Sequence, residues 1–440
     1  MKTVRFLVHL FITYILTNRL YFVLGLVLSV LLIIFPIQFS SVFNQHRART
    51  IGISGNYTVS SLPVEVQNLI SIGLTRLLPD NTATGAAAIS WEATDSGKRV
   101  TFLLQNNLKW QDGTAFNSSQ VNYNLKSVEL AKDDPTHISF LFKEPFAPLP
   151  TILSQPLFKS GLVGLGNYAV QGLKFNGRFL SQIELKKSKT NDTIVYKFYP
   201  RETDLVTALK LGAVNEIHKL HQLSDISQDN HYQVTSATQS ATVVTLFFNT
   251  QKPPFEEKQL RQALAYALPD NYQDSEKAYA PVPKDSWFES PNIKKYHQDF
   301  DTSKKILDKI ASQTGTIKIT IQTNKSLETI ALQIKDSWAN VGIESKVEIT
   351  DVVPESYDLY LAYLELPPDP DQYALWHSTQ TGNISHYKSP KIDKLLEEGR
   401  RTLNIQDRFD IYSNFEKAIT EDLPAVFLYY PQIYTIKKAP

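Results

Sequence analysis

The chain has 440 residues, too many for one hydrophobic core, and its composition, 42% hydrophobic and 20% charged, is that of an ordinary globular protein. The formal net charge is +1, but the basic residues before Thr50 leave 40 basic against 44 acidic residues in the remainder, which disfavours nucleic-acid binding. There is no cysteine, which excludes disulfides, thiol catalysis and thiolate metal sites.

An uncharged apolar run occupies residues 20–37. At about 1.5 Å per residue, a helix of this length spans about 27 Å, close to the thickness of a bilayer's hydrocarbon core. The run is longer than the apolar part of a usual signal peptide and no small-residue cleavage site follows, so an uncleaved signal anchor is expected, with a cleaved signal peptide as the alternative. Residues 1–49 then comprise a cytoplasmic N-terminus and a single-pass anchor in the cell membrane. The remainder would lie on the extracellular or periplasmic side, because Lys2, Arg5 and Arg19 precede the run.

Hydrophobic patterning predicts mainly strands in the first half of the body that follows. The strongly apolar run TVVTLFF at 242–248 is expected to be a strand buried on both faces. Strands are predicted at 51–55, 99–104, 137–142, 183–187, 194–199 and 242–248, and helices at 62–78, 118–128 and 203–211.

From residue 256 onwards, helical and strand patterns alternate, which indicates crossover units in an α/β lobe. Beyond a short apolar strand starting at Tyr357 comes an acidic, proline-rich turn. Helices are predicted at 258–267, 302–311, 327–340, 390–401 and 405–421, and further strands at 317–322, 343–349 and 425–430.

Several ordered motifs resemble those of one family. The sequence VTFLLQNNLKWQDGTAFNSSQV at 100–121 is similar to its strand, K-W-x-D-G-x-P-F hairpin and following helix. The sequence GLGNY at 164–168 resembles its G-T-G-P-Y motif, and 206–213 resembles its A-L-x-x-G motif. FNTQKPPFEEKQLRQALAYAL at 248–268 resembles F-N-x-K-x-P-P-F…R-x-A-x-x-x-A. This family is the extracellular solute-binding proteins of peptide-type ABC importers, and the resemblance covers almost all of 51–434.

The resemblance implies an α/β, two-lobed periplasmic-binding-protein fold with two hinge crossings, here preceded by the transmembrane helix. Lobe one is expected at 50–252 plus 424–440, and lobe two at 253–423. A monomer of this kind captures a peptide or peptide-like solute and delivers it to permease subunits that work with separate ATPase subunits. Two alternatives stay open: a non-peptide solute such as an oligosaccharide or chelated metal, or a surface interaction or chaperone-like protein that no longer transports.

The resemblance also points to ligand-binding residues. An extended segment near the start of lobe one and the strand before the K-P-P-F turn line the family's cleft, which here indicates Tyr57, Thr58, Phe248 and Asn249. Phe248 is also compatible with a purely structural place in the core. A short link at 126–136 replaces a longer insertion of many relatives, so the cleft is expected to be more open on one side.

From lobe two, the family supplies a tryptophan and an aspartate that holds the peptide's α-amine. This chain has Leu364 and Pro367 at those places. A buried ammonium without a partner is costly, so a free-amine ligand needs another acid. The acids in reach are Glu365, Asp369 and Asp371, although the two aspartates could simply stabilise the proline turn.

Tyr373 and Trp376 would offer ring faces to ligand side chains of varied shape, or pack structurally. His218 and His221 are three residues apart, but no third metal ligand is nearby and a solvated helix is expected there. The sequence has no H-E-x-x-H, G-x-S-x-G or phosphate-loop motif, so we expect neither an enzyme nor a bound cofactor.

Overall fold

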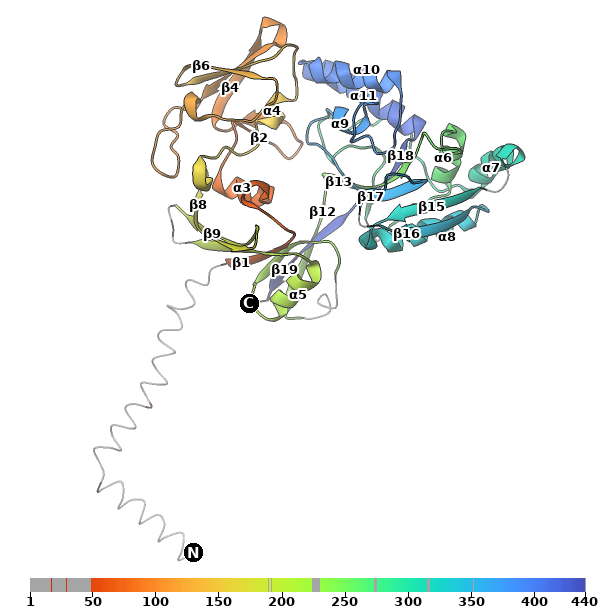
Figure 1. The fold of residues 1–440 in the computed structure, drawn as a ribbon, viewed down its shortest axis with the longest axis horizontal. Helices are drawn as coiled ribbons and strands as arrows, with labels where there is room; N and C mark the ends of the chain where they lie inside the picture. The colour runs from red at the N-terminus through yellow and green to blue at the C-terminus, as the bar shows by residue number, and fades with distance from the viewer. Residues whose placement is uncertain are drawn as a thin grey trace, which may run out of the picture.

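The computed structural model describes residues 49–439, apart from 189, 191, 224–229, 273–274, 315–316 and 351, together with Thr17 and Ser29. Two α/β lobes, each built on its own sheet, confirm the two-lobed α/β part of the predicted fold (Figure 1). The predicted anchor at 20–37 lies outside the described residues except for Ser29. Within the described part of the chain, no helix is long and apolar enough to cross a membrane.

Lobe one is built on a seven-stranded sheet in the order β12-β19-β11-β1-β10-β9-β8. α3 (Val64–Ile70) packs on one face and α5 (Glu202–Lys210) packs on the other. A Cβ on Gly52 of β1 would lie 2.3 Å from Leu205 Cδ1, so glycine is what allows α5 to approach the sheet. The strands are β1 (Arg49–Ser54), β8 (Tyr168–Asn176), β9 (Phe179–Lys187), β10 (Thr193–Tyr199), β11 (Glu216–Leu220), β12 (Tyr232–Thr238) and β19 (Gln432–Lys438).

A smaller antiparallel sheet, β4-β5-β7-β6, forms a separate layer of lobe one that we call the four-stranded subdomain. Its core contains Trp110, Phe102 and Phe140, all at most 2% exposed. The short hairpin β2–β3 and the one-turn helix α4 connect it to the rest of lobe one. The elements are β2 (Thr75–Leu77), β3 (Ala83–Gly85), β4 (Ala88–Thr94), β5 (Arg99–Leu104), β6 (Glu129–Asp134), β7 (His137–Leu141) and α4 (Leu149–Ile152).

The predicted helix at 118–128 is wrong. Only a 3-10 turn, Ser118–Gln120, forms there, and the Asn117 side chain caps it. Beyond the turn, Val121 and Tyr123 are buried at every second position and the Tyr123 hydroxyl donates to the Leu153 carbonyl at 2.9 Å. Burial with a period of two favours an extended chain over the helix that propensity suggests.

The helix expected at 62–78 is also shorter than predicted, because α3 ends at Ile70. The Ile70 carbonyl accepts hydrogen bonds from the Gly166 amide and the Gln111 side chain, both at 2.9 Å. A Cβ on Gly73 would lie 2.3 Å from the Leu153 carbonyl oxygen. These contacts with Gln111 and with the 153–166 segment hold 71–74 extended.

Lobe two is built on a six-stranded sheet in the order β14-β18-β13-β17-β15-β16. One face packs against α6, α7 and α8, and the other against α9, α10 and α11. The strands are β13 (Thr242–Phe248), β14 (Glu276–Lys277), β15 (Lys318–Thr323), β16 (Glu344–Ile349), β17 (Leu359–Glu365) and β18 (Ala425–Tyr430). The helices are α6 (Lys258–Tyr266), α7 (Phe300–Thr314), α8 (Glu328–Ala339), α9 (Tyr373–Trp376), α10 (Pro390–Arg401) and α11 (Ile405–Asp422).

The chain passes between the two sheets at 239–241 and again at Pro431, not near 252 and 424 as expected. β13 is buried along its whole length, as predicted, but it pairs with β17 and β18 and therefore belongs to lobe two. A strand that is mostly apolar and fully buried fits the centre of either sheet, so its sequence does not identify its partner strands. The short segments joining β12 to β13 and β18 to β19 are the crossings.

Glu416 of α11 is a carboxyl in the core of lobe two and is 1% exposed. Its Oε2 accepts a hydrogen bond from the Ser290 amide at 3.0 Å, while Oε1 has no hydrogen-bond partner within the described residues. Burial raises its pKa from 4.5 to about 8.

Because the pKa of Glu416 is higher in the folded state, stability should fall as the pH rises from about 4.5 towards 8. Each pH unit in this window changes the free energy of unfolding by up to about 1.4 kcal/mol. We expect Glu416→Gln to remove about 2 kcal/mol of this dependence between pH 5.5 and 7.5, measured by urea unfolding. The exposed Glu398→Gln is the control, and equal pH profiles for Glu416→Gln and the parent chain would contradict the expectation.

Candidate functional site

The carboxyl ends of the parallel strands in both lobes lie beside the crossings. β1 is parallel to β10 and β11, and β15 is parallel to β16 and β17. At the end of β11, Leu220 pairs with Tyr434 near the start of β19, and at the end of β17, Glu365 pairs with Thr242. Ligands of open α/β sheets bind outside the carboxyl ends of the strands, so the space between these two edges is the candidate site.

Tyr57 and Thr58 follow β1 at the carboxyl edge of lobe one and keep part of their surface exposed. The Tyr57 hydroxyl donates to the Ser54 carbonyl at 2.9 Å, and its ring lies 5.1 Å from that of Phe198. Burial raises the pKa of Tyr57. Thr58 caps a 3-10 turn and lines a hollow of about 570 Å³. Both residues are therefore placed where a solute could touch them, and their role in binding stays a prediction.

Lys219 is a feature of this edge that the sequence did not reveal. It has φ +57° within β11, where the pairing with β19 is irregular, and its ammonium lies 2.5 Å from Glu65 on α3. Left-handed backbone is uncommon for a residue other than glycine and often marks a bulge that redirects a side chain. Here the bulge brings a lysine to the α3 side of lobe one.

The segment containing His218 and His221 was expected to be helical, but 216–220 form β11. His218 contacts Glu216 at 3.2 Å and His221 contacts Glu202 at 2.6 Å, so the two imidazoles have different carboxylate partners. No group of three or more His, Asp or Glu in the described ranges could hold a metal ion.

The side chains of β17 alternate between the two faces of its sheet. Leu364 and Leu366 pack in the core beneath α9, α10 and α11, whereas Tyr363 packs towards α6, α7 and α8. Glu365 ends the strand, is exposed, and by this alternation lies on the same side as Tyr363. The Tyr363 ring is 6.2 Å from that of His221 in lobe one. Glu365 is thus accessible at the lobe boundary.

Three of the predicted ligand-binding residues are instead enclosed in lobe two. Phe248 is 0% exposed and packs against Phe255, and Trp376 is 1% exposed and packs against rings in the core. The Asn249 side chain donates to the Tyr357 carbonyl at 3.0 Å. In this structure these side chains make core packing contacts and a backbone hydrogen bond, and their role in binding stays a prediction.

The Asp369 carboxylate is also paired with a side chain of the protein itself. It is 7% exposed and both of its oxygens accept from the Arg408 guanidinium, one of them at 3.0 Å. Asp371 accepts from Arg400 at 2.8 Å, although burial raises its pKa. The two aspartates of the proline turn therefore bind arginines of α10 and α11 rather than facing the candidate site.

Tyr373 lies at a contact between lobe two and the four-stranded subdomain, which Figure 1 shows beside α9 and α10. The Arg400 guanidinium lies 4.3 Å from the Tyr373 ring and 5.6 Å from the Phe146 ring. The Ala147 amide donates to the Arg400 carbonyl at 2.8 Å, and Arg401 pairs with Glu144 at 2.8 Å. We call this set the mouth contact.

The loops of the two lobes touch at a second place, away from the crossings. Asn81 donates to the Ser286 hydroxyl at 2.9 Å, and the Trp287 amide donates to the Asp80 carbonyl at 3.0 Å. The β2–β3 hairpin of lobe one, whose turn contains Asp80 and Asn81, therefore contacts lobe two. That the short link at 126–136 leaves the cleft more open on one side stays a prediction.

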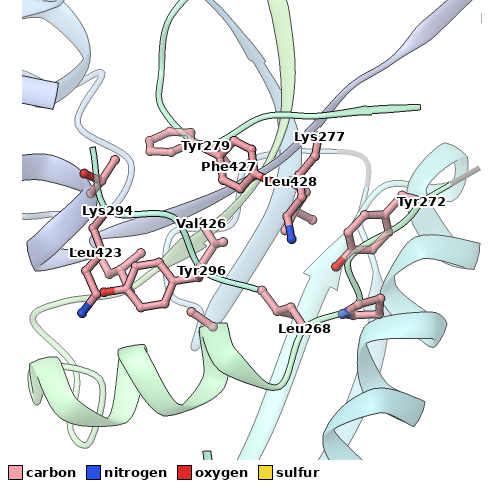
Figure 2. A pocket seen from close by; sticks show the side chains of 13 residues that line it. Leu268, Tyr272, Lys277, Tyr279, Lys294, Tyr296, Leu423, Val426, Phe427 and Leu428 are labelled. Atoms are coloured by element: carbon pink, nitrogen blue, oxygen red, sulfur yellow. The ribbon is translucent and has the colours of Figure 1, made fainter. Parts of the chain in front are cut away.

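A separate groove of lobe two, seen in Figure 2, lies between the end of α6 and β18. Tyr272, Tyr279 and Tyr296 line it together with Lys277 and Lys294. It holds about 20 Å³, which is room for about one water molecule. A space this small does not accommodate a peptide.

The family model of bacterial extracellular solute-binding proteins, family 5, matches residues 82–385. The probable D,D-dipeptide-binding periplasmic protein DdpA of Escherichia coli is 22% identical over 410 residues, which cover 78% of each chain. The substrate-binding protein CtaP of Listeria monocytogenes has a TM-score of 0.76 at 19% identity, covering 89% of this chain and 94% of the other. NikZ of Campylobacter jejuni in complex with Ni(L-His) has a TM-score of 0.73 at 20% identity, with the same coverage. At these identities the structural likeness shows the fold.

The Asp369–Arg408 pair predicts a structural rather than a ligand-binding phenotype. Asp369→Asn leaves a buried guanidinium incompletely paired, so we expect the free energy of unfolding to fall by about 3 kcal/mol. Chemical denaturation measures this, with the exposed Asp410→Asn as control. If Asp369→Asn left the free energy of unfolding unchanged but abolished solute binding, the expectation would be contradicted and Asp369 would be assigned to the binding site.

Proposed function

The chain belongs to family 5 of the bacterial extracellular solute-binding proteins, and from this premise we propose that it captures a peptide or peptide-like solute between its lobes for an ABC importer. The family match over 82–385 carries the proposal. The carboxyl edges of the two sheets, which lie beside the crossings, support it. The bound solute would pass to permease subunits that work with separate ATPase subunits.

The two crossings provide a simple mechanism for capture. They are short, at 239–241 and Pro431, and the Gln239 amide donates to the Pro431 carbonyl at 2.9 Å. Bending at these adjacent segments would move one lobe against the other as a rigid body. At micromolar affinity, about 8 kcal/mol would be divided between solute contacts and closure.

The N-terminal run at 20–37 would hold this binding body, as a monomer, at the outer face of the cell membrane. The apolar length of the run and the basic residues before it support this part of the proposal. A tether of this kind would keep the captured solute close to the permease.

A non-peptide solute is the second candidate, because Leu364 and Pro367 replace the tryptophan and the aspartate with which the family binds a peptide. Leu364 is 5% exposed and belongs to the core, while Asp369 and Asp371 bind arginines. Glu365 is the acid of the lobe-two segment that stays accessible. A chelated metal is one such solute, as NikZ is in complex with Ni(L-His).

Solute-dependent closure tests the proposal directly. Because the chain has no cysteine, Lys186→Cys and Lys304→Cys place one spin label on the outer surface of each lobe. We expect a peptide pool to shorten the mean label-to-label distance and to narrow the distribution of distances in the detergent-solubilised full chain. Double electron–electron resonance measures both. A response to nickel–histidine but not to peptides would favour the second candidate. No response to either, with no solute retained in native mass spectrometry, would overturn solute capture.

If Glu365 binds the α-amine of a peptide, Glu365→Gln should lower the affinity for free-amine peptides about tenfold more than the affinity for their N-acetylated forms. Only the free-amine peptides lose a charge-assisted hydrogen bond. Isothermal titration measures both affinities. Glu344→Gln, an exposed change on β16, is the control. Equal weakening of both peptide forms would remove Glu365 from this role.

A further inference from the structure

A cavity of about 360 Å³ lies at the mouth contact, between the four-stranded subdomain and lobe two. Lobe one contributes the segments 126–128 and 142–146, and lobe two contributes Tyr373 and the end of α10. None of these residues belongs to the carboxyl edges of the sheets. The cavity is therefore distinct from the candidate site between those edges.

The charges around the cavity do not balance. Four cations line it, against the two acids Glu144 and Glu397. Arg401 is paired with Glu144, and Arg400 is paired with Asp371 behind the cavity wall. The remaining cations, Lys126 and Lys143, are exposed and have no acidic partner among the residues that the structure describes.

The other surfaces of the cavity are apolar and aromatic. The rings of Phe142 and Phe146 lie 5.6 Å apart, and Val128 and Tyr373 complete the lining. The Arg400 guanidinium contacts the rings of Phe146 and Tyr373 and so fixes the aromatic groups of both lobes against each other. Cationic groups at the rim of an aromatic floor suit a ligand with an apolar body and one negative charge.

We propose that this cavity is a second binding site, which takes a small aryl or alkyl carboxylate and exists only while the mouth contact is made. The carboxylate would lie near Lys126 and Lys143, with the apolar body on the aromatic floor. This inference rests on the proposed function, because it assumes that the lobes open and close. A ligand held by walls from both lobes stabilises the arrangement in which those walls meet.

Charge selectivity is the first test. Saturation-transfer and titration NMR on the full chain would compare 3-phenylpropionate with 3-phenylpropylamine, which has a similar shape and the opposite charge. We expect the carboxylate to bind at least about tenfold more tightly. Equal binding of the two probes would overturn the proposal, as would the absence of binding by 3-phenylpropionate.

Substitutions on both walls give opposite expected changes. The double substitution Lys126→Gln and Lys143→Gln should lower the affinity for 3-phenylpropionate about tenfold. Glu397→Gln, on lobe two, should raise this affinity several-fold. Lys304→Gln with Lys305→Gln, a change of equal charge on α7, should have no effect. If the two double substitutions lower the affinity for the probe equally, the attraction comes from the charge of the whole surface, and the proposed site is rejected.

The same variants separate this inference from the proposed function. The Lys126→Gln and Lys143→Gln double variant should still show solute-dependent closure in the spin-label experiment. Closure without selective binding of 3-phenylpropionate would refute the second site alone. Selective binding of the probe without closure by any solute would refute capture and, with it, the claim that the cavity opens and closes.

Discussion

The two crossings between the lobes are tied together by a backbone hydrogen bond, from the Gln239 amide to the Pro431 carbonyl at 2.9 Å. It joins the two points at which the chain leaves one sheet and enters the other. Directly beyond it, the Leu366 amide donates to the Ala241 carbonyl at 2.8 Å, which attaches the end of β17 to the first crossing. The wall of lobe two that the sequence suggested as a ligand surface is thus fixed to the hinge itself.

Much of the fold could be predicted because local signals and tertiary packing agree. α10 starts at Pro390 after the Ser389 cap, and α11 starts after the Asn404 cap, so both helices were expected within a residue of their observed bounds. β13 was recognised because its sequence is strongly apolar. Among the strands that escaped recognition, β12 and β19 are partly polar and pair with each other. That pairing joins segments almost 200 residues apart, which no local pattern records.

The candidate site could be predicted less well than the fold, for a physical reason. A family resemblance indicates which segment lines a cleft, but the neighbours of each side chain decide whether it is accessible. Trp376 is buried because Phe247 and Phe427 enclose it, and Asp369 is neutralised by Arg408, which lies 39 residues later. Lys219 was missed because its position depends on a bulge in β11. Glu365 and Tyr57 stay accessible because each lies where a strand meets the boundary between the lobes.

The mouth contact combines two kinds of interaction that respond differently to the surrounding medium. The Glu144–Arg401 pair lies at the surface, with side chains 61% and 51% exposed, so dissolved ions screen it strongly. The hydrogen bond from the Ala147 amide to the Arg400 carbonyl joins main-chain atoms and carries no net charge. At high salt concentration the contact would therefore weaken but keep its register. Because main-chain atoms make this hydrogen bond, substitutions of the side chains at positions 147 and 400 would leave both the donor and the acceptor in place.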